Sequence, residues 1–159
     1  MIDRKPEREI TDPDELLHVL ERAKILRLGM CAGNEPYVVP MNYGLGENCL
    51  FLHSSPRGKK ADMLRANPRV CFEMETDVAL IEGDAPCGFT MRFRSIVGYG
   101  MASFLETREE KLHGMKQIMA HYSDTEFKDE DFLEKVLAKT SVMRLDIESM
   151  RGAKHGWND

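Results

Sequence analysis

The sequence predicts a mainly β protein with helices (α+β), in which a small antiparallel barrel of about six strands carries helices on its surface. Apolar and polar residues alternate over short segments, and turns separate several of these segments at hairpin spacing. Three or four helical segments interrupt the strands irregularly, whereas a doubly wound parallel sheet would alternate strand and helix. The 159 residues suffice for one compact domain, 1–159, and not for two independent cores.

The N-terminal part is expected to be a helix followed by a three-stranded meander. Asp12 fits the N-cap, Pro13 the first helical position and Glu15 the third position after the cap. The apolar face of this helix consists of Leu16, Leu20 and Ala23. Strands are then expected at 25–31, 36–42 and 49–54, with turns at 33–35 and 44–48.

A second helix is expected at 56–66, and it ends at Asn67 because a residue before proline avoids the α region. The following segment, 69–76, alternates as a half-buried strand does, with Val70, Phe72 and Met74 on its apolar face. A loop at 82–88 precedes a long β-like segment, 89–106, which forms one strand or two. Gly98 and Gly100 mark a bend or bulge in it.

The C-terminal part should contain two further helices and a last strand. Thr107 and Glu110 form a capping box, which starts a helix with an apolar face. That face comprises Leu112, Met115, Met119 and Tyr122. A shorter helix is expected at 132–137 and a strand around Met143, Leu145 and Ile147. The tail, 151–159, is polar except for Trp157.

Composition excludes several classes of function. The formal net charge of −5 and the pI of about 5.6 argue against a nucleic-acid partner. No apolar run approaches the roughly 20 residues that span a bilayer, so no membrane partner is expected. The charged N-terminus lacks a secretory signal, which predicts a cytoplasmic protein. The four cysteines, Cys31, Cys49, Cys71 and Cys87, show no metal or dithiol spacing and are interpreted as packing residues. No metal site is predicted.

The segment 53–60 is richer in hydroxyl groups and cations than packing requires. His53 and Ser54 end a predicted strand, and Lys59 and Lys60 lie at the start of a predicted helix. Backbone N–H groups and the helix dipole favour an anion there, so this segment is a candidate phosphate site. A solvated basic turn is the alternative, and a lone histidine such as His53 is more often a surface residue than a catalyst.

Two strand features remain open from the residues alone. Pro40 removes a ladder donor from its strand, which indicates either an edge strand or a ligand ring in place of the missing pairing. Arg92 and Arg94 share one strand face, and the default expectation is a salt bridge to Glu73 or Glu75, with solvent or an anion as the alternatives.

Six short motifs occur in a characteristic order along the chain. They are Arg-Leu-Gly-Met at 27–30, Tyr-Val-Val-Pro-Met-Asn-Tyr-Gly at 37–44, Phe-Leu-His-Ser at 51–54, Gly-Lys-Lys at 58–60, Asn-Pro-Arg-Val-Cys-Phe-Glu at 67–73 and Met-Arg-Phe-Arg-Ser-Ile-Val-Gly-Tyr-Gly at 91–100. In this order they resemble the flavin-binding split-barrel proteins related to pyridoxamine 5′-phosphate oxidase, and most of all the nitroimidazole-resistance (Nim-type) branch.

The resemblance implies a six-stranded antiparallel split β-barrel of the FMN-binding type, and a homodimer with FMN at its interface. It assigns cofactor-binding roles to Val39, Pro40, Met41, Asn42, His53, Ser54, Lys59, Lys60, Arg94 and Ser95. Backbone atoms of 39–42 would face the isoalloxazine edge, and the two lysines would hold the phosphate. Arg94 and Ser95 would approach from the partner subunit.

The function that this resemblance implies is an FMN-dependent oxidoreductase acting on a small planar acceptor, such as a nitroimidazole or another nitroaromatic compound. NADH or NADPH is the expected electron donor and His53 the candidate catalytic residue. The alternative is a non-catalytic flavin- or haem-binding protein of the same fold, with FAD or haem in place of FMN and His53 as an axial ligand. A cofactor-free dimeric scaffold is a third interpretation. The C-terminal residues differ from the Arg-x-His segment of true pyridoxamine phosphate oxidases, which argues against that activity.

Overall fold

The computed structural model of the protein describes residues 6–157. Within this range eight strands form one sheet in the order β3-β2-β6-β7-β8-β5-β4, and β1 pairs with β8. All of these pairings are antiparallel. The strands are β1 (Glu9–Ile10), β2 (Leu26–Ala32), β3 (Glu35–Met41), β4 (Tyr43–Gly46), β5 (Cys49–Ser54), β6 (Arg69–Ile81), β7 (Thr90–Phe104) and β8 (Ser141–His155).

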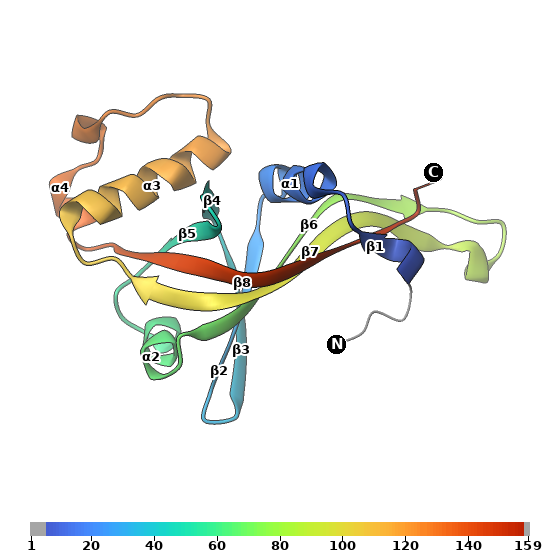
Figure 1. Ribbon diagram of the computed structural model, residues 1–159, viewed down its shortest axis with the longest axis horizontal. Helices are drawn as coiled ribbons and strands as arrows, with labels where there is room; N and C mark the ends of the chain where they lie inside the picture. Colours follow the sequence, from blue (N-terminus) through green and yellow to red (C-terminus); the bar gives the residue numbers. More distant parts are fainter. Residues whose placement is uncertain (1–5, 158–159) are drawn as a thin grey trace.

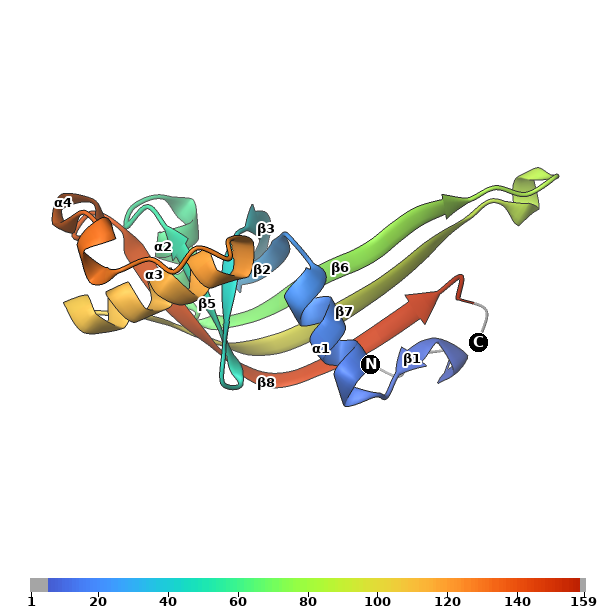
Figure 2. The same cartoon turned by 90° about the horizontal axis from the view of Figure 1, so that it is seen from above.

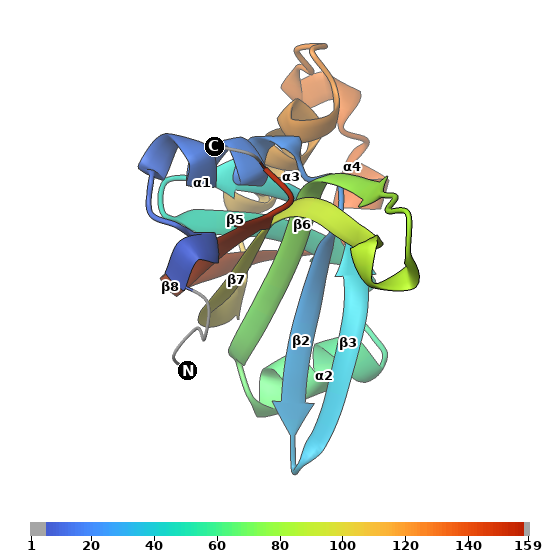
Figure 3. The same cartoon turned by 90° about the vertical axis from the view of Figure 1, so that its right-hand side faces the viewer.

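Figure 1 shows the helices α3 and α4 at one end of this sheet, α1 above its middle and α2 below it. They are α1 (Pro13–Arg22), α2 (Lys59–Ala66), α3 (Arg108–Tyr122) and the single turn α4 (Glu134–Leu137). Short 3₁₀ turns occur at Pro6–Arg8, Pro86–Gly88 and Asp129–Asp131. Figure 3 shows β2 and β3 running side by side, with α2 next to them. The predicted α+β class is therefore confirmed. Among the described residues, no helix is long and apolar enough to cross a membrane.

The core lies inside the coiled sheet, where side chains from most strands meet. Its largest fully buried members include Leu26, Leu28, Tyr43, Leu50, Leu52, Phe72, Met74, Ile96, Met143 and Leu145. The predicted alternation of β6 is confirmed, since Val70, Phe72 and Met74 are buried and Cys71 and Glu75 are exposed. Burial of this apolar area is the main favourable contribution to the stability of the fold.

Local signals in the sequence place the helix starts. The Asp12 carboxylate accepts a hydrogen bond from the Asp14 N–H at 3.0 Å, as expected of an N-cap. Thr107 and Glu110 form the predicted capping box of α3. Glu15 does not complete a box in α1, because its carboxylate instead binds Arg94 and Lys154. Long-range ion pairs thus replace the local hydrogen bond that the spacing suggested.

The prediction of six strands is wrong, because the described residues form eight. The additional strands are the two-residue β1 and the short β4, which occupies part of the segment interpreted as a turn. Gly44 in β4 is required by close packing, since a Cβ atom there would lie 2.3 Å from the backbone carbon of Gln117 in α3. Gly44 was therefore interpreted as a turn residue, whereas it is a strand residue whose missing side chain lets α3 pack closely against β4.

Other boundaries also differ from the sequence prediction. The helix expected at 56–66 begins only at Lys59, and the helix expected at 132–137 is reduced to the turn Glu134–Leu137. The segment expected to be one strand or two is the single strand β7. A register shift against β8 lies between Tyr99 and Gly100, where a bulge was expected. Most of the expected tail is strand, because β8 extends to His155 and pairs with β7 as far as Phe93. Residues 158–159 of that segment lie outside the described residues.

The cysteine prediction holds for one residue in four. Cys49 is buried, whereas Cys31, Cys71 and Cys87 are exposed, and all four are free thiols. Cys71 lies on the outer face of β6, because the opposite face carries the buried residues of that strand. Alternation along a strand, rather than residue type, decides which thiols are buried.

Candidate functional site

The ends of β3 and β5 and the start of α2 meet at one place. Met41 ends β3, His53 and Ser54 end β5, and Lys59 and Lys60 open α2. The Lys60 Nζ atom lies 3.7 Å from the Met41 Sδ atom, and its charge acts on His53. We call these five residues the α2 cradle. The structure thus brings Met41, His53 and Lys60 together, and Ser54 follows His53 in the chain. The Lys59 ammonium instead reaches Glu35, at the other end of β3.

The backbone leaves the cradle open on one side of β5. The β4–β5 ladder ends at the pair Tyr43–Leu52, so His53 and Ser54 pair only with β8. The chain then turns at Gly58. Its φ of 106° is a backbone conformation that residues with a side chain rarely adopt, and α2 begins at the next residue, Lys59. Gly58 provides no side-chain cap, so the first N–H groups of α2 are not satisfied by a capping side chain.

Lys60 is a half-buried cation in this cradle. Burial lowers the pKa of its ammonium group below the ordinary value of 10.5. Among residues 6–157 no carboxylate forms an ion pair with the Lys60 ammonium group. Its polar contact within this range is with the Met41 thioether. A partly desolvated charge without a counter-ion is unfavourable, so an anion at this position would stabilise it.

His53 lies beside Lys60 and is also half-buried. Burial lowers the pKa of the imidazole below 6.5, and the positive charge of Lys60 lowers it further. Both effects favour the neutral ring at neutral pH. A neutral imidazole can donate one hydrogen bond and accept another, which suits a residue that exchanges a proton with a bound molecule.

Lys59 differs from Lys60 in its surroundings. Its Nζ atom lies 2.5 Å from a carboxylate oxygen of Glu35 and 4.7 Å from the centre of the Tyr37 ring. Its charge is therefore already compensated, and about half of its side chain is exposed. The sequence analysis missed Glu35 and Tyr37. Glu35 was interpreted as a turn residue. Its ion pair with Lys59 forms only when α2 packs beside the start of β3, which the local sequence does not show.

The remaining residues of the segment 39–42 line the edge of the sheet. β3 is the first strand in the sheet order and pairs only with β2, so the edge-strand interpretation of Pro40 is confirmed. Val39 is half-buried, whereas Pro40 and Asn42 are exposed. The outer edge of β3 is thus available at the side of the cradle, where FMN was expected to meet backbone atoms.

Arg94 and Ser95 lie far from the cradle of their own chain. Arg65 of α2 contacts the ring of Phe104 at one end of β7, with 5.1 Å from the guanidinium carbon to the ring centre. Arg94 is ten residues further along that strand, and at about 3.3 Å per residue the separation along β7 is roughly 30 Å. The ion-pair partners of Arg94 are Glu15 and Asp77, neither of which belongs to the cradle.

The expected salt bridges of Arg92 and Arg94 to Glu73 or Glu75 are absent. Arg27 occupies both glutamates, at 2.8 and 2.9 Å. Arg94 instead binds Glu15 at 2.6 Å and Asp77 at 2.9 Å. Glu73 and Glu75 lie on the outer face of β6, while Arg94 lies on the opposite side of the sheet against α1. The sequence analysis expected β6 and β7 to be neighbours, which is correct. It did not predict that Arg94 and the two glutamates lie on opposite faces of the sheet.

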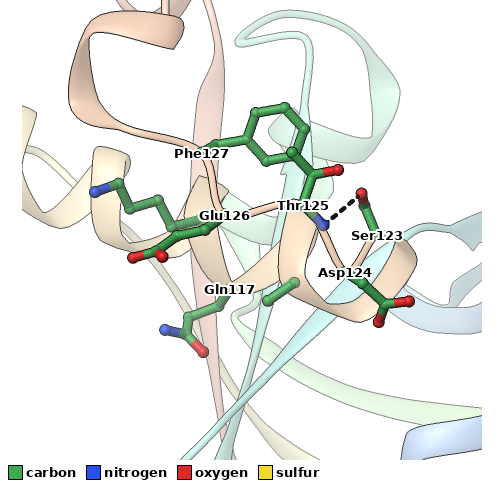
Figure 4. A pocket seen from close by; sticks show the side chains of 8 residues that line it. Gln117, Ser123, Asp124, Thr125, Glu126 and Phe127 are labelled. Carbon is green, nitrogen blue, oxygen red and sulfur yellow. Dashed lines mark hydrogen bonds between the residues drawn. The ribbon is translucent and has the colours of Figure 1, made fainter.

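A hollow of about 330 Å³ lies elsewhere, at the C-terminal end of α3 (Figure 4). Side chains of α3 and of the loop that follows it form the lining, where the Thr125 N–H donates to the Ser123 hydroxyl at 3.1 Å. None of the residues predicted to bind FMN is among the eight that line this hollow.

The sequence profile of the pyridoxamine 5′-phosphate oxidase family matches residues 12–154, which is most of the chain. The chain belongs to this family. The match extends from the N-cap of α1 almost to the end of β8 and so includes every residue of the α2 cradle. The family resemblance inferred from the six motifs is thereby confirmed.

Solved structures agree with this assignment. A protein from Bacteroides thetaiotaomicron VPI-5482, proposed to be a 5-nitroimidazole antibiotic resistance protein, is 30% identical, with a TM-score of 0.79 over 91% of this chain and 84% of that one. The flavocytochrome Anf3 from Azotobacter vinelandii is 17% identical, with a TM-score of 0.83 over 99% and 75%. A FAD-binding protein from Mesorhizobium loti is 24% identical, with a TM-score of 0.68 over 94% and 98%. The last two show the fold alone.

One curated protein also matches. It is an uncharacterized protein of Rhizobium meliloti (strain 1021), 34% identical over 61 residues. The match covers 38% of this chain and 40% of that protein. It adds a relative without a known activity.

Proposed function

We propose that this protein is an FMN-dependent oxidoreductase that works as a homodimer with the flavin at the subunit interface. The observation that carries the proposal is the α2 cradle. There a half-buried Lys60 without a carboxylate partner among the described residues lies beside the uncapped start of α2 and the neutral imidazole of His53. These are the groups that a phosphate and an adjoining flavin ring need.

The cradle fits the phosphate of FMN in charge and in space. A Cβ atom at Gly58 would meet no atom within 4 Å, so the approach to the start of α2 is open. The N–H groups of the first turn and the Lys60 ammonium would hold the phosphate, with the Ser54 hydroxyl beside them. The ring would then lie along the edge of β3, against the backbone of 39–42, with His53 close to it.

A second copy would complete this site. The outer face of β7 exposes Val97, Tyr99 and Met101, and exposed apolar side chains gathered on one strand are typical of an interaction surface. A twofold axis on this face would bring Ser95, which shares the face of Val97, toward the second copy. The Arg94 side chain lies on the opposite face, against Glu15 and Asp77, so this contact does not support its expected role at the partner's cradle. FAD in place of FMN would need room for a second nucleotide beyond the phosphate.

The proposed substrate is a small planar acceptor, with nitroimidazoles and other nitroaromatic compounds as the first candidates. The similarity to the Bacteroides thetaiotaomicron protein supports this choice. Bound FMN supplies reversible hydride and electron transfer, for which NADH or NADPH is the proposed donor. The protein would bind and orient the flavin, and His53 would supply a proton-transfer group beside it.

Turnover tests the enzyme proposal. The FMN-loaded protein is expected to reduce a nitroimidazole with NADH or NADPH under anaerobic conditions. Replacing His53→Gln should lower kcat by about 100-fold, as expected when a proton-transfer group is lost, while the FMN content stays the same. Absence of turnover with either donor would contradict the proposal. Equal kcat in the variant would remove His53 from the mechanism.

A non-catalytic haem protein is the second candidate, and His53 is the observation that favours it. Its imidazole is half-buried and held neutral, which is the form that binds iron. The same turnover experiment separates the two candidates, because a haem store would show a Soret band and no nitro reduction.

The pH dependence of FMN binding follows from the pKa of Lys60. The free protein loses the Lys60 charge at a lower pH than an ordinary lysine does, and only the charged form attracts phosphate. FMN affinity should therefore fall as pH rises through this lowered pKa, below 10.5. In Lys60→Arg the guanidinium stays charged, so the alkaline loss should disappear. Titration by quenching of FMN fluorescence between pH 7 and 10 tests this, and parallel curves for the two proteins would contradict it.

A further inference from the structure

One face of β3 meets the start of α2. Alternation along the strand places Glu35, Tyr37, Val39 and Met41 on that face. Figures 1 and 2 show from two directions that α2 lies beside the hairpin of β2 and β3. The first two residues of α2 are both lysines, and they reach this face of β3 at different points.

The two ammonium groups lie far apart although their residues are neighbours in the chain. The Lys60 Nζ atom contacts the Met41 Sδ atom, where β3 ends. The Lys59 Nζ atom contacts the Glu35 carboxylate and the Tyr37 ring, where β3 begins. At about 3.3 Å per residue, Tyr37 and Met41 lie roughly 13 Å apart along the strand. Only the Lys60 ammonium is therefore left beside Met41 in the cradle.

Glu35 holds the Lys59 ammonium at the start of β3. The two side chains form an ion pair, and the Tyr37 ring adds a cation–π contact. The side chains of Glu35 and Lys59 are 64% and 48% exposed, so water weakens their pair. Lys59 is the first residue of α2 and has a flexible stem. Without Glu35, its ammonium would therefore be able to turn toward an anion at the helix start.

The number of cations at the cradle matters because the two common flavin nucleotides differ in their phosphates. FMN ends in one phosphate, whereas FAD carries a diphosphate that leads to a second nucleotide. One cation and the N–H groups of the first turn of α2 match a single phosphate. For the second phosphate of FAD, Glu35 has already neutralised Lys59, and a carboxylate repels a phosphate.

We propose that Glu35 sets the cofactor specificity of the α2 cradle: by holding Lys59 at the start of β3 it leaves one cation for one phosphate, which favours FMN over FAD. The inference rests on the proposed flavin site and adds its selectivity. Glu35 acts through Lys59, so it is a positioning residue. Loss of its charge should change the choice between the two flavins and leave the site able to bind them.

Glu35→Gln tests this role, since it removes the charge and keeps the size of the side chain. The preference for FMN, measured as the ratio of the FAD to the FMN dissociation constant, should fall about fivefold, as expected for an exposed charged pair. Glu35→Asp keeps the charge and should retain most of the preference. Isothermal titration with each flavin gives the ratios, and circular dichroism shows that each variant is folded.

Two controls separate this effect from a general change in charge or shape. Riboflavin has no phosphate, so its affinity should be the same for the wild type and for Glu35→Gln. Glu126→Gln makes the same change of charge in the hollow at the C-terminal end of α3, which no cradle residue lines. It should leave the FMN preference unchanged. A riboflavin affinity that changes as much as the FAD affinity would overturn the role of Glu35 in phosphate selection.

The double variant Glu35→Gln/Lys59→Ala tests whether Lys59 carries the effect. With no lysine to release, it should show the same FMN preference as Lys59→Ala alone. A lower preference in the double variant than in Lys59→Ala would overturn the role of Lys59. Tight FMN binding by the wild type with an unchanged ratio in Glu35→Gln would overturn the inference and leave the flavin site standing. A wild type that binds neither flavin would overturn the site itself.

Discussion

Replacing Lys60→Ala is expected to weaken FMN binding by roughly 10- to 150-fold. A hydrogen bond to a charged group contributes about 1.5–3 kcal/mol, and each 1.4 kcal/mol corresponds to about a factor of ten. Lys60 should give the full effect because no carboxylate among the described residues competes for its charge. Lys59→Ala should cost less than about tenfold, because Glu35 already compensates that charge and the side chain is half exposed.

Riboflavin provides the control for this prediction, since it has the ring of FMN and no phosphate. Its affinity should be the same for the wild type and for Lys60→Ala. Lys128→Ala, which removes an exposed lysine in the segment between α3 and α4, should leave the affinity for FMN unchanged. Isothermal titration of each protein with both flavins gives the four comparisons. If the Lys60 variant loses riboflavin as strongly as FMN, the phosphate assignment is wrong.

Gly44→Ala should destabilise the protein by about 3 kcal/mol or more, at the upper end for overpacking. The added Cβ atom would lie 2.3–2.5 Å from backbone atoms of Gln117 and Ile118 in α3, and backbone atoms cannot move aside as a side-chain tip can. Either α3 or β4 must shift. Because Met41 lies three residues before Gly44, a shift of β4 should also reduce FMN affinity.

Gly33→Ala is the matched control for this substitution. Gly33 has a φ of 57°, so an alanine there is strained, but nothing lies within 4 Å of the added Cβ atom. The expected cost is about 1 kcal/mol, from backbone conformation alone. Urea unfolding followed by circular dichroism measures both variants. Equal costs would show that the contact between β4 and α3 relaxes freely.

Local patterns in the sequence were sufficient for much of the fold. The N-cap at Asp12, the capping box at Thr107 and the alternation in β6 depend on neighbouring residues, and all three are confirmed. The edge position of Pro40 follows from its missing N–H in the same way. Features of this kind are encoded within a few residues and therefore can be predicted.

Features that depend on distant parts of the chain were missed. The role of Gly44 is set by α3, more than seventy residues later, and Glu15 prefers Arg94 to its own helix N-terminus. Trp157 was placed in a polar tail, because only pairing with β7 shows that β8 continues to His155. Side-chain face and long-range partner are tertiary properties, which no local spacing determines.

The candidate site was predicted in part from the residues and in part from the family resemblance. The basic segment at 53–60 indicated a phosphate site from the residues alone, with a solvated basic turn as the alternative, because cations and hydroxyls at a strand-to-helix junction favour an anion. The difference between Lys59 and Lys60 could not be predicted. It depends on Glu35, which lies at the start of β3 and forms an ion pair with Lys59 of α2.

The absorption spectrum of the purified protein, with the released cofactor identified by mass, tests the central claim most directly. The account predicts a two-band flavin spectrum and release of FMN, or full uptake of added FMN by protein purified without it. A Soret band would indicate haem at His53 instead. A colourless protein that takes up no FMN would contradict the assignment of the α2 cradle as a flavin phosphate site.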